Sequence, residues 1–425
     1  MKIKLSTIVL ITVLIIIAIV GGTKLGHQNE DTPQQTVENT DNSETTPRET
    51  SKNNVTQTSS SNQVTQETTK KGSTPIISEK LDVDEVLSNS NADYFIYIEL
   101  GGGTITVYGK SVSGKYDEVI KSSPASVGLD QSTPTGIFYL KGRKEWMEIE
   151  GEGFVRYATM SDHDVSISSA LYETDDGNTL IRKSYLGLGQ PATGGNIYTV
   201  ADTAYWITQH CLDGTVIQIV EESPKNIVCD PLPELNSEYF FTDPTDPSHK
   251  TLAELEEAGD LPYSIYLEKG SFTMTVYKKD ENGDYTIPVR AFNTAVGRTA
   301  GRTPVGTFEI YKKERWHQFS YNGGFAQYAT SYYGNLFIHS PIYGLMEIDT
   351  MLAEFYNEIG TNSTAGCLRT TSYASYWVYS YCPMGTPVMI VNGSPKGTIS
   401  EKPPKIPDVY MTTDPTDPFN PDSIY

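Results

Sequence analysis

The chain has 425 residues, of which 37% are hydrophobic, 20% are charged and only four are cysteines. Its 53 acidic residues outnumber its 32 basic residues, and the formal net charge of −21 disfavours nucleic acid as a partner because like charges repel. The length allows two or three domains. Four cysteines in so long a chain exclude a small scaffold held together by disulfides.

The N-terminus consists of a basic tip and an uncharged apolar run. Lys2 and Lys4 precede Leu5–Val20, which is dominated by Ile, Val and Leu. As a helix, residues 5–22 nearly match a bilayer core of about 30 Å. A cleaved signal peptide is the alternative, although Val20-Gly21-Gly22 is a weak cleavage site. We expect a cytoplasmic tip over residues 1–4, a transmembrane signal-anchor over 5–22 and an exported remainder.

Residues 23–78 are rich in Ser, Thr, Asn and Gln and contain few large apolar side chains. Such a stretch cannot bury enough apolar surface to offset the entropy lost on ordering, so we predict a disordered linker. The linker would let the following domains move through the layer outside the membrane, which in bacteria is the cell wall. The predicted location is therefore the cell membrane, crossed once, with the domains facing the wall.

The remainder contains an internal repeat at a nearly constant spacing. Tyr205-Trp206 matches Tyr376-Trp377, and Thr242–Pro247 matches Thr413–Pro418, in both cases 171 residues later. A match this long predicts the tandem duplication of a whole domain, because solenoid repeats are much shorter. The two copies are placed at 79–249, with a core at 92–223, and at 250–425, with a core at 262–394 and a Pro-rich tail. The repeated Asp-Pro-Thr-Asp-Pro pieces read as linkers by composition.

Short strands dominate both copies. Phe272–Tyr277 and Tyr285–Arg290 flank Asn282-Gly283 and predict a hairpin. Trp316–Tyr321 and Phe325–Ser331 predict a second strand pair. The fold class is therefore mainly β, with two tandem sandwich-like domains and one or two helices in each.

Two segments of the second copy are predicted to be helical. Ile348, Leu352, Phe355 and Ile359 repeat at helical spacing and predict a helix over Glu347–Ile359. A second short helix is expected over Leu252–Ala258, ahead of the core.

Residues with catalytic chemistry gather in the second copy. Cys367 lies in the segment Ser363–Arg369, and His339 follows the apolar strand Leu336–Ile338. A thiol becomes a strong nucleophile when an imidazole removes its proton or when a nearby cation lowers its pKa. His339 can serve as that base, and Arg369 can supply the positive charge. Gly366 leaves the backbone beside the sulfur open, so that a carbonyl can approach and local N–H groups can stabilise an oxyanion.

The second copy resembles the L,D-transpeptidase catalytic domain of the YkuD type. Four pieces occur in the order of that family, namely Thr303–Phe308, Ile338–Ser340, Gly366–Arg369 and Trp377–Val388. The family usually has a His before the Gly of its Cys motif, where this chain has Ala365.

The resemblance implies an enzyme that cross-links or remodels peptidoglycan through a Cys thioester, using stem peptides as donor and acceptor. It implies Cys367 as nucleophile, His339 as general base, and Arg369 as a residue that holds the catalytic loop or a substrate carboxylate. It also suggests substrate contacts at Ser340, Tyr343 and Thr364. This chemistry requires no cofactor, and no metal site is expected because no Cys or His cluster has metal-ligand spacing.

The first copy lacks the chemical residues at the corresponding positions. Ser168, Asn196 and Tyr198 stand where the second copy has His339, Cys367 and Arg369, although Gly195 keeps its place. We therefore expect a degenerate domain that folds but does not catalyse, and that serves as a scaffold or a binding module.

Several alternatives remain open from the sequence. Cys367 could form a disulfide with Cys382, although Cys211 occupies the Cys382 position in a copy that has Asn196 opposite Cys367. A pairing of Cys211 with Cys229 is undecided. At the level of function, the alternatives are an L,D-carboxypeptidase, which would transfer the acyl group to water, and a non-catalytic pseudoenzyme that binds the cell wall.

Overall fold

The structure is a computed structural model that describes residues 82–222, 228–320, 323–393 and 400–425. The chain divides into two compact units, 1–70 and 71–425, and all described residues belong to the second. The expected signal-anchor over 5–22 and the expected linker over 23–78 lie outside the described residues. Among the described residues, no helix has the length and apolar character needed to cross a membrane.

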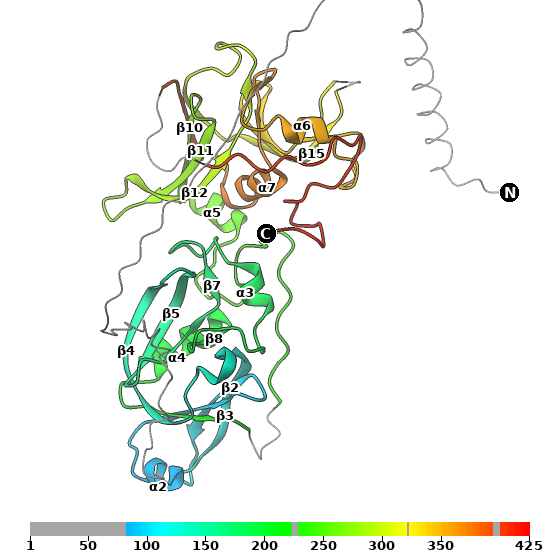
Figure 1. The fold of residues 1–425 in the computed structure, drawn as a ribbon. Helices are drawn as coiled ribbons and strands as arrows, with labels where there is room; N and C mark the ends of the chain where they lie inside the picture. Colours follow the sequence, from blue (N-terminus) through cyan, green and yellow to red (C-terminus); the bar gives the residue numbers. More distant parts are fainter. Residues whose placement is uncertain (1–81, 223–227, 321–322, 394–399) are drawn as a thin grey trace, which may run out of the picture. The chain divides into compact units, whose positions relative to one another are not determined.

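The described residues fold mainly as β-strands, which confirms the predicted class (Figure 1). In the first half, residues 82–249, β4 and β9 extend the sheet on one side of β1 and β2, and β3 leads to β8, β6, β5 and β7 on the other. The elements of this half are α2 (Val83–Ser88), β1 (Tyr94–Glu99), β2 (Thr104–Lys110), β3 (Tyr116–Ser126), η1 (Leu129–Gln131), β4 (Gly136–Ile149), β5 (Gly153–Ser161), β6 (Ser166–Ser169), β7 (Leu171–Tyr172), α3 (Arg182–Leu186), β8 (Ile197–Thr199), α4 (Ala201–His210) and β9 (Val216–Val220).

The second half, residues 250–425, contains two five-stranded sheets and a short pair formed by β13 and β19. One large sheet has the order β12-β11-β10-β21-β14, and the other consists of β15, β16, β17 and β20, with β18 paired to β16. The elements of this half are α5 (Leu252–Ala258), β10 (Tyr263–Glu268), β11 (Thr273–Lys279), β12 (Tyr285–Asn293), β13 (Val296–Gly297), β14 (Gly306–Glu309), β15 (Lys312–Gln318), β16 (Phe325–Tyr333), β17 (Leu336–His339), β18 (Ile342–Tyr343), α6 (Ala353–Asn357), β19 (Asn362–Thr364), β20 (Leu368–Arg369), α7 (Ser372–Tyr381) and β21 (Pro387–Val391).

Corresponding elements follow the same order in the two halves. The first strand of each core pairs in parallel with the last, β1 with β9 and β10 with β21. The last helix of each core packs on the matching strand, α4 on β5 and α7 on β16. The predicted hairpin is present as β11 and β12, and the second predicted strand pair as β15 and β16, both antiparallel. The predicted helix Leu252–Ala258 is α5, with the predicted bounds.

The predicted helix over Glu347–Ile359 is wrong in extent, because only Ala353–Asn357 is helical. The first part is held in another way: the backbone of Met351 exchanges two hydrogen bonds of 2.9 Å with Thr412, and the Thr350 hydroxyl bonds the Glu347 carbonyl at 2.8 Å. The apolar spacing in this segment therefore reflects burial in an irregular turn. Sequence reasoning also missed α7, because burial of nearly all its residues leaves no polar face to mark a helix.

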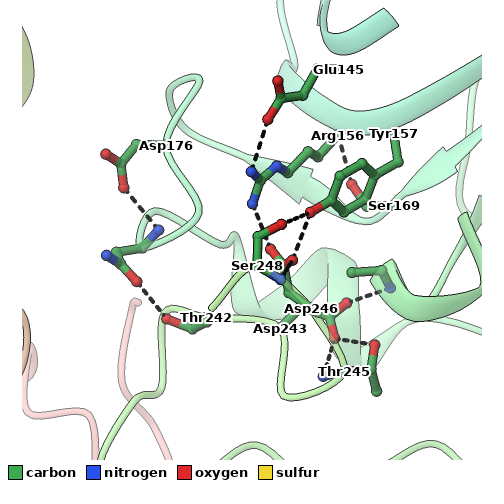
Figure 2. A network of polar contacts seen from close by, with 12 residues as sticks. Glu145, Arg156, Tyr157, Ser169, Asp176, Thr242, Asp243, Thr245, Asp246 and Ser248 are labelled. Atoms are coloured by element: carbon green, nitrogen blue, oxygen red, sulfur yellow. Dashed lines mark hydrogen bonds and ion pairs between the residues drawn. The ribbon is translucent and has the colours of Figure 1, made fainter. Parts of the chain in front are cut away.

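The two Asp-Pro-Thr-Asp-Pro segments are folded parts of the domains, so their interpretation as linkers is wrong. Asp243 accepts a 2.9 Å hydrogen bond from the backbone N–H of Ala201, the first residue of α4, and its other oxygen holds the Thr245 hydroxyl at 2.7 Å (Figure 2). Asp414 binds the N–H of Ser372, the first residue of α7, in the same way at 3.0 Å. Each carboxylate therefore satisfies an N–H group that a helix start leaves without a partner.

Candidate active site

His339 and Arg369 lie on two short neighbouring strands, and Cys367 directly precedes the second. β17 and β20 run in parallel, with Ile338 opposite Leu368 and His339 opposite Arg369. Side chains alternate between the two faces of a strand, so His339 and Arg369 share a face with the residues two positions before them, Phe337 and Cys367. Cys367 and Phe337 belong to one small apolar cluster together with Ala329. The fold therefore pairs the expected base with the expected cation, and the expected nucleophile lies two residues before that cation.

Cys367 is 9% exposed and its thiol is the neutral form in the resting structure. Burial raises the pKa of the thiol, while the backbone N–H of Phe337 and the positive charge of Arg369 lower it. The Sγ atom lies 4.0 Å from the carbonyl oxygen of Asn335, a weak contact in which the thiol donates. No hydrogen bond joins Cys367 to His339 within the described residues.

His339 is buried and held in one tautomer. Its Nδ1–H donates to the backbone carbonyl of Ser340 at 2.6 Å, which leaves Nε2 without a proton. Burial lowers the pKa of His339 to about 3, and the charges of Arg369 and His317 add to this effect. The Phe319 ring lies 4.9 Å from the imidazole. His339 is therefore a neutral imidazole whose Nε2 lone pair can accept a proton.

Arg369 contacts the loop that carries Cys367. Its Nη2 group donates to the Ser363 hydroxyl at 2.7 Å and to the carboxylate of Glu358. The guanidinium also lies 5.0 Å from the centre of the Phe355 ring. Of the two roles expected for Arg369, these contacts match the one that holds the catalytic loop.

Gly366 shapes the loop and does not offer its N–H to a substrate. Its φ of +140° is a backbone conformation that side-chain-bearing residues rarely adopt, and a Cβ here would lie 2.5 Å from the Arg302 carbonyl oxygen. The Gly366 N–H donates to the Thr364 hydroxyl at 3.1 Å, and the Gly366 carbonyl accepts from Thr303 at 2.8 Å. This N–H is therefore engaged within the loop, and the expected stabilisation of an oxyanion by local N–H groups stays a prediction.

The three expected substrate-binding residues are engaged within the fold. The Thr364 hydroxyl donates to the Cys367 carbonyl at 2.7 Å. Ser340 donates to the Pro341 carbonyl at 2.9 Å and accepts from the Gln327 N–H at 2.8 Å. The Tyr343 hydroxyl bonds Ser372 at 2.8 Å, and the side chain is fully buried. All three hold the site together from within, and their expected contacts with a substrate stay predictions.

Sequence reasoning missed two features near Cys367. The ring of His317 lies 4.2 Å from that of Phe337, and its Nδ1 contacts the Glu314 carboxylate. Arg298 donates from Nε to the Ser363 carbonyl at 2.9 Å and from its backbone N–H to Thr364 at the same distance. Neither residue belongs to a local motif with Cys367, so only the pairing of segments that are distant in the sequence brings them close to the Cys367 loop.

The four cysteines are free thiols. Cys382 lies in the main core of the second half, separate from the cluster of Cys367, and Cys211 lies in a core of the first half. The Cys367–Cys382 and Cys211–Cys229 disulfides are therefore not formed. Across the described residues, no group of three or more His, Cys, Asp or Glu side chains is arranged to hold a metal ion.

The first half places its substituted residues in the same arrangement. Ser168 on β6 pairs with Tyr198 on β8, as His339 pairs with Arg369. The Asn196 side chain accepts hydrogen bonds from Ser166, from the hydroxyl at 2.9 Å and from the N–H at 3.2 Å. At the position equivalent to Cys367, the first half thus has an amide side chain that is engaged in hydrogen bonds within the fold.

One known family matches part of the second half. Residues 262–390 match the YkuD family, described as the L,D-transpeptidase catalytic domain. No curated protein matches the chain.

Solved structures similar to this chain include an L,D-transpeptidase from Mycobacterium smegmatis, with 21% identity, 30% of this chain and 59% of that chain covered, and a TM-score of 0.25. An L,D-transpeptidase from Mycobacterium tuberculosis is 19% identical to this chain. The match covers 31% of this chain and 58% of that chain, with a TM-score of 0.25. A fused amidase, peptidase and peptidoglycan-binding protein from Clostridium acetobutylicum is 19% identical to this chain. The match covers 33% of this chain and 61% of that protein, with a TM-score of 0.24. This chain thus spans about three fifths of the length of these structures, and the family match to residues 262–390 carries the assignment.

Proposed function

We propose that this protein is an L,D-transpeptidase that cross-links or remodels peptidoglycan through a thioester on Cys367. The observation that carries the proposal is the pairing of β17 with β20, which puts His339 opposite Arg369 and two residues from Cys367 in register, inside the region that matches the YkuD family. The enzyme class follows from that match, and the roles of the individual residues are inferred from their geometry.

Acylation starts from two neutral groups. The Cys367 Sγ attacks the carbonyl carbon of a donor stem peptide while its proton passes to Nε2 of His339, which the Nδ1–H bond to Ser340 leaves free. The resulting imidazolium protonates the departing amine, the C–N bond breaks, and a thioester remains on Cys367. Arg369 holds the loop through Ser363 and favours negative charge on the sulfur as the proton leaves.

The thioester is resolved by the reverse sequence. An amine of a neighbouring stem peptide attacks the thioester carbon and gives its proton to His339, a new amide bond forms, and the sulfur of Cys367 leaves and is reprotonated. With water in place of the amine, the same steps release a shortened stem peptide, which is the carboxypeptidase alternative.

A mass-spectrometric experiment tests the proposal. The chain is incubated with muropeptides, and Cys367 is examined for a covalent peptide adduct whose mass lacks the terminal amino acid. Cys367→Ala should give no adduct, whereas Cys229→Ser, which removes a partly exposed thiol in the first half, should leave adduct formation unchanged. Linked muropeptide dimers among the products would identify a transpeptidase, and shortened monomers a carboxypeptidase.

One observation favours the pseudoenzyme alternative, in which the protein binds the wall without reacting. The Cys367 thiol is buried, its pKa is raised, and it has no hydrogen bond to His339 in the described residues. A wild-type chain that binds muropeptides and never forms an adduct would establish this alternative.

The proposal places the protein in the cell membrane, with its domains outside and facing the wall. It rests on the basic tip and the uncharged run of Leu5–Val20, followed by the polar linker. Stem peptides of the wall are then the donor and the acceptor, and the acyl transfer described above requires no cofactor.

A further inference from the structure

We propose that the protein carries a separate binding site for an acidic saccharide, in a cavity of about 510 Å³ between α5, α7 and β15–β16 of the second half and residues 237–239 at the end of the first half. Its walls include the tyrosines Tyr239, Tyr328, Tyr376 and Tyr379 and one cation, Arg315. The lining contains neither Cys367 nor His339. The site is therefore distinct from the one proposed for acyl transfer.

The strand pair β15–β16 beside the cavity has an equivalent in the first half, the pair β4–β5, so the residues at equivalent positions can be compared. In the first half Trp146 pairs with Arg156, and Tyr157 follows with a φ of +56°. In the second half Trp316 pairs with Gln327, and Tyr328 follows with a φ of +51°. The residues just before the two tryptophans, Glu145 and Arg315, therefore occupy equivalent positions of opposite charge.

In the first half this place is a closed polar network (Figure 2). Arg156 bonds Glu145 at 2.9 Å and Asp246 at 2.8 Å, while the Tyr157 hydroxyl bonds Asp246 at 2.8 Å and Ser248 at 2.6 Å. Each charged group that is labelled there has a protein partner. A smaller cavity of about 330 Å³ beside this network has Thr208 in its wall, where α7 has Tyr379.

In the second half the equivalent groups lack these partners. Asp417 is bonded by Gln327 at 2.7 Å and not by Tyr328, and Phe419 stands where the first half has Ser248. The Tyr328 hydroxyl and the Arg315 Nη1 are buried without a hydrogen-bond partner in the described part of the chain. Arg315 lies 4.1 Å from the centre of the Tyr328 ring and has no ion pair with a described carboxylate. The second half thus has, at an aromatic cavity, an arginine whose Nη1 has no hydrogen-bond partner among the described residues and whose positive charge acts on Asp417 without an ion-pair contact.

This chemistry selects the ligand class. An arginine guanidinium binds a carboxylate with two parallel hydrogen bonds, and a ligand carboxylate would give the Arg315 Nη1 the partner that it lacks. Tyrosine rings pack against the C–H faces of a sugar ring, and their hydroxyl groups bond its polar edge. Glu238 and Glu256 also line the cavity, at its wall with α5, and restrict the anionic end of a ligand to the side of Arg315. An acidic sugar therefore fits the site better than a neutral sugar or an isolated anion.

Binding of three small probes to the full chain tests the inference. N-acetylmuramic acid carries a sugar ring and a carboxylate, N-acetylglucosamine has the same ring without the carboxylate, and lactate has the carboxylate without the ring. The choice of these sugars rests on the proposed function. The titrations use the Cys367→Ala chain, so that failure of acyl transfer and failure of sugar binding are separate results.

We expect N-acetylmuramic acid to bind more tightly than either fragment, and Arg315→Gln to weaken its binding at least about tenfold. N-acetylglucosamine binding should not change in Arg315→Gln. The matched control, Glu145→Gln at the equivalent position of the first half, should bind as the parent does. Tyr379→Thr, which introduces the residue that α4 has at this place, gives a second variant and should weaken binding of both sugars.

Two outcomes would overturn the inference. One is equal binding of N-acetylmuramic acid by the parent, Arg315→Gln and Tyr379→Thr, with thermal unfolding confirming that at least one variant is folded. The other is the absence of saturable binding by the parent chain at millimolar sugar.

Discussion

At the scale of single residues, the candidate site shows how burial controls the reactivity of the thiol. The pKa of Cys367 is raised by burial, and that of His339 is lowered to about 3. The resting pair is therefore neutral, unlike a thiolate–imidazolium pair, in which both groups are charged near pH 7. The two groups can exchange a proton only in the course of the reaction.

This difference gives a pH prediction for the free protein. Without substrate, alkylation of Cys367 by iodoacetamide should be slow at pH 7 and should rise steadily up to and beyond pH 9, because only the thiolate reacts and the raised pKa keeps it scarce. The measurement is the rate of mass labelling at Cys367 across this range. A rate that is already maximal at neutral pH would show that the thiolate is preformed.

Gly366 should tolerate no side chain. Gly366→Ala forces a Cβ to within 2.5 Å of the Arg302 carbonyl at a φ of +140°, so we expect a loss of roughly 1–3 kcal/mol in stability and displacement of the Cys367 loop. Thermal unfolding and adduct formation on Cys367 measure the two effects. Gly301→Ala is the matched control, since a Cβ there meets nothing within 4 Å. Equal behaviour of the two variants would contradict the role given to Gly366.

At the scale of elements, the buried aspartates that bind the N-termini of α4 and α7 are expected to make folding stability depend on pH. Burial raises the pKa of Asp243 to about 6, above the value of about 3.9 for an unfolded chain. The folded state therefore binds this proton more readily than the unfolded state, and the contribution of Asp243 to stability increases as the pH falls from 7 to 4.

Asp243→Asn should remove that contribution. We expect the difference in unfolding free energy, wild type minus variant, to move in favour of the wild type as the pH is lowered from 7 to 4. Denaturant unfolding at several pH values measures this difference. Asp130→Asn, at an exposed carboxylate, is the control. A difference that is constant with pH would mean that Asp243 keeps an ordinary pKa in the fold.

The same elements show what the sequence could predict. Alternating strands and the Asn282-Gly283 turn led to β11 and β12, and the helix expected over Leu252–Ala258 is α5. Helix α7 was not predicted, because it is buried on all sides and so has no alternation of polar and apolar residues at helical spacing. The role of Asp243 escaped because Asp, Pro and Thr also make up linkers, and only the tertiary contact with Ala201 distinguishes the two.

The candidate site was predictable where local motifs exist and not beyond them. Cys367, His339 and Arg369 were found from the resemblance of their segments, and the strand pairing places two of them opposite each other. The engagement of Ser340, Tyr343 and Thr364 within the fold depends on hydrogen bonds to distant or irregular segments, which a sequence pattern does not encode. The proposal for the cavity beside Arg315 rests on the opposite charges of Glu145 and Arg315. These residues are recognised as equivalent only when the strand pairings of the two halves are compared.

At the scale of the whole molecule, the two halves share an order of elements and differ in chemistry. The first half has Ser168 and Tyr198 paired where the second has His339 and Arg369. An amide such as that of Asn196 is a poor nucleophile near neutral pH, and a serine cannot act as the base. All acyl transfer should therefore depend on the second half.

The full chain carrying Cys367→Ala tests this division. It keeps the complete first half, and we expect no covalent muropeptide adduct anywhere in it, because that half has Asn196 and Ser168 in place of the thiol and the imidazole. Peptide mapping after incubation with muropeptides is the measurement, with wild type as the positive control. An adduct on a first-half residue would show that this half reacts after all.

The last prediction concerns the N-terminal segment, which lies outside the described residues. The uncharged run Leu5–Val20 after Lys2 and Lys4 is long enough, with the two glycines that follow, to span a bilayer core of about 30 Å as a helix. We expect the full chain to stay with the membrane fraction after a high-salt wash and to be released by detergent. Protease added from outside should remove both halves, because the basic tip stays in the cytoplasm. Replacing Leu14 and Ile16 with Asp should shift the chain to the soluble fraction or block its export, since each charge is costly at the centre of a bilayer. A mature chain that begins near Thr23 in the medium would show instead that the segment is cleaved as a signal peptide.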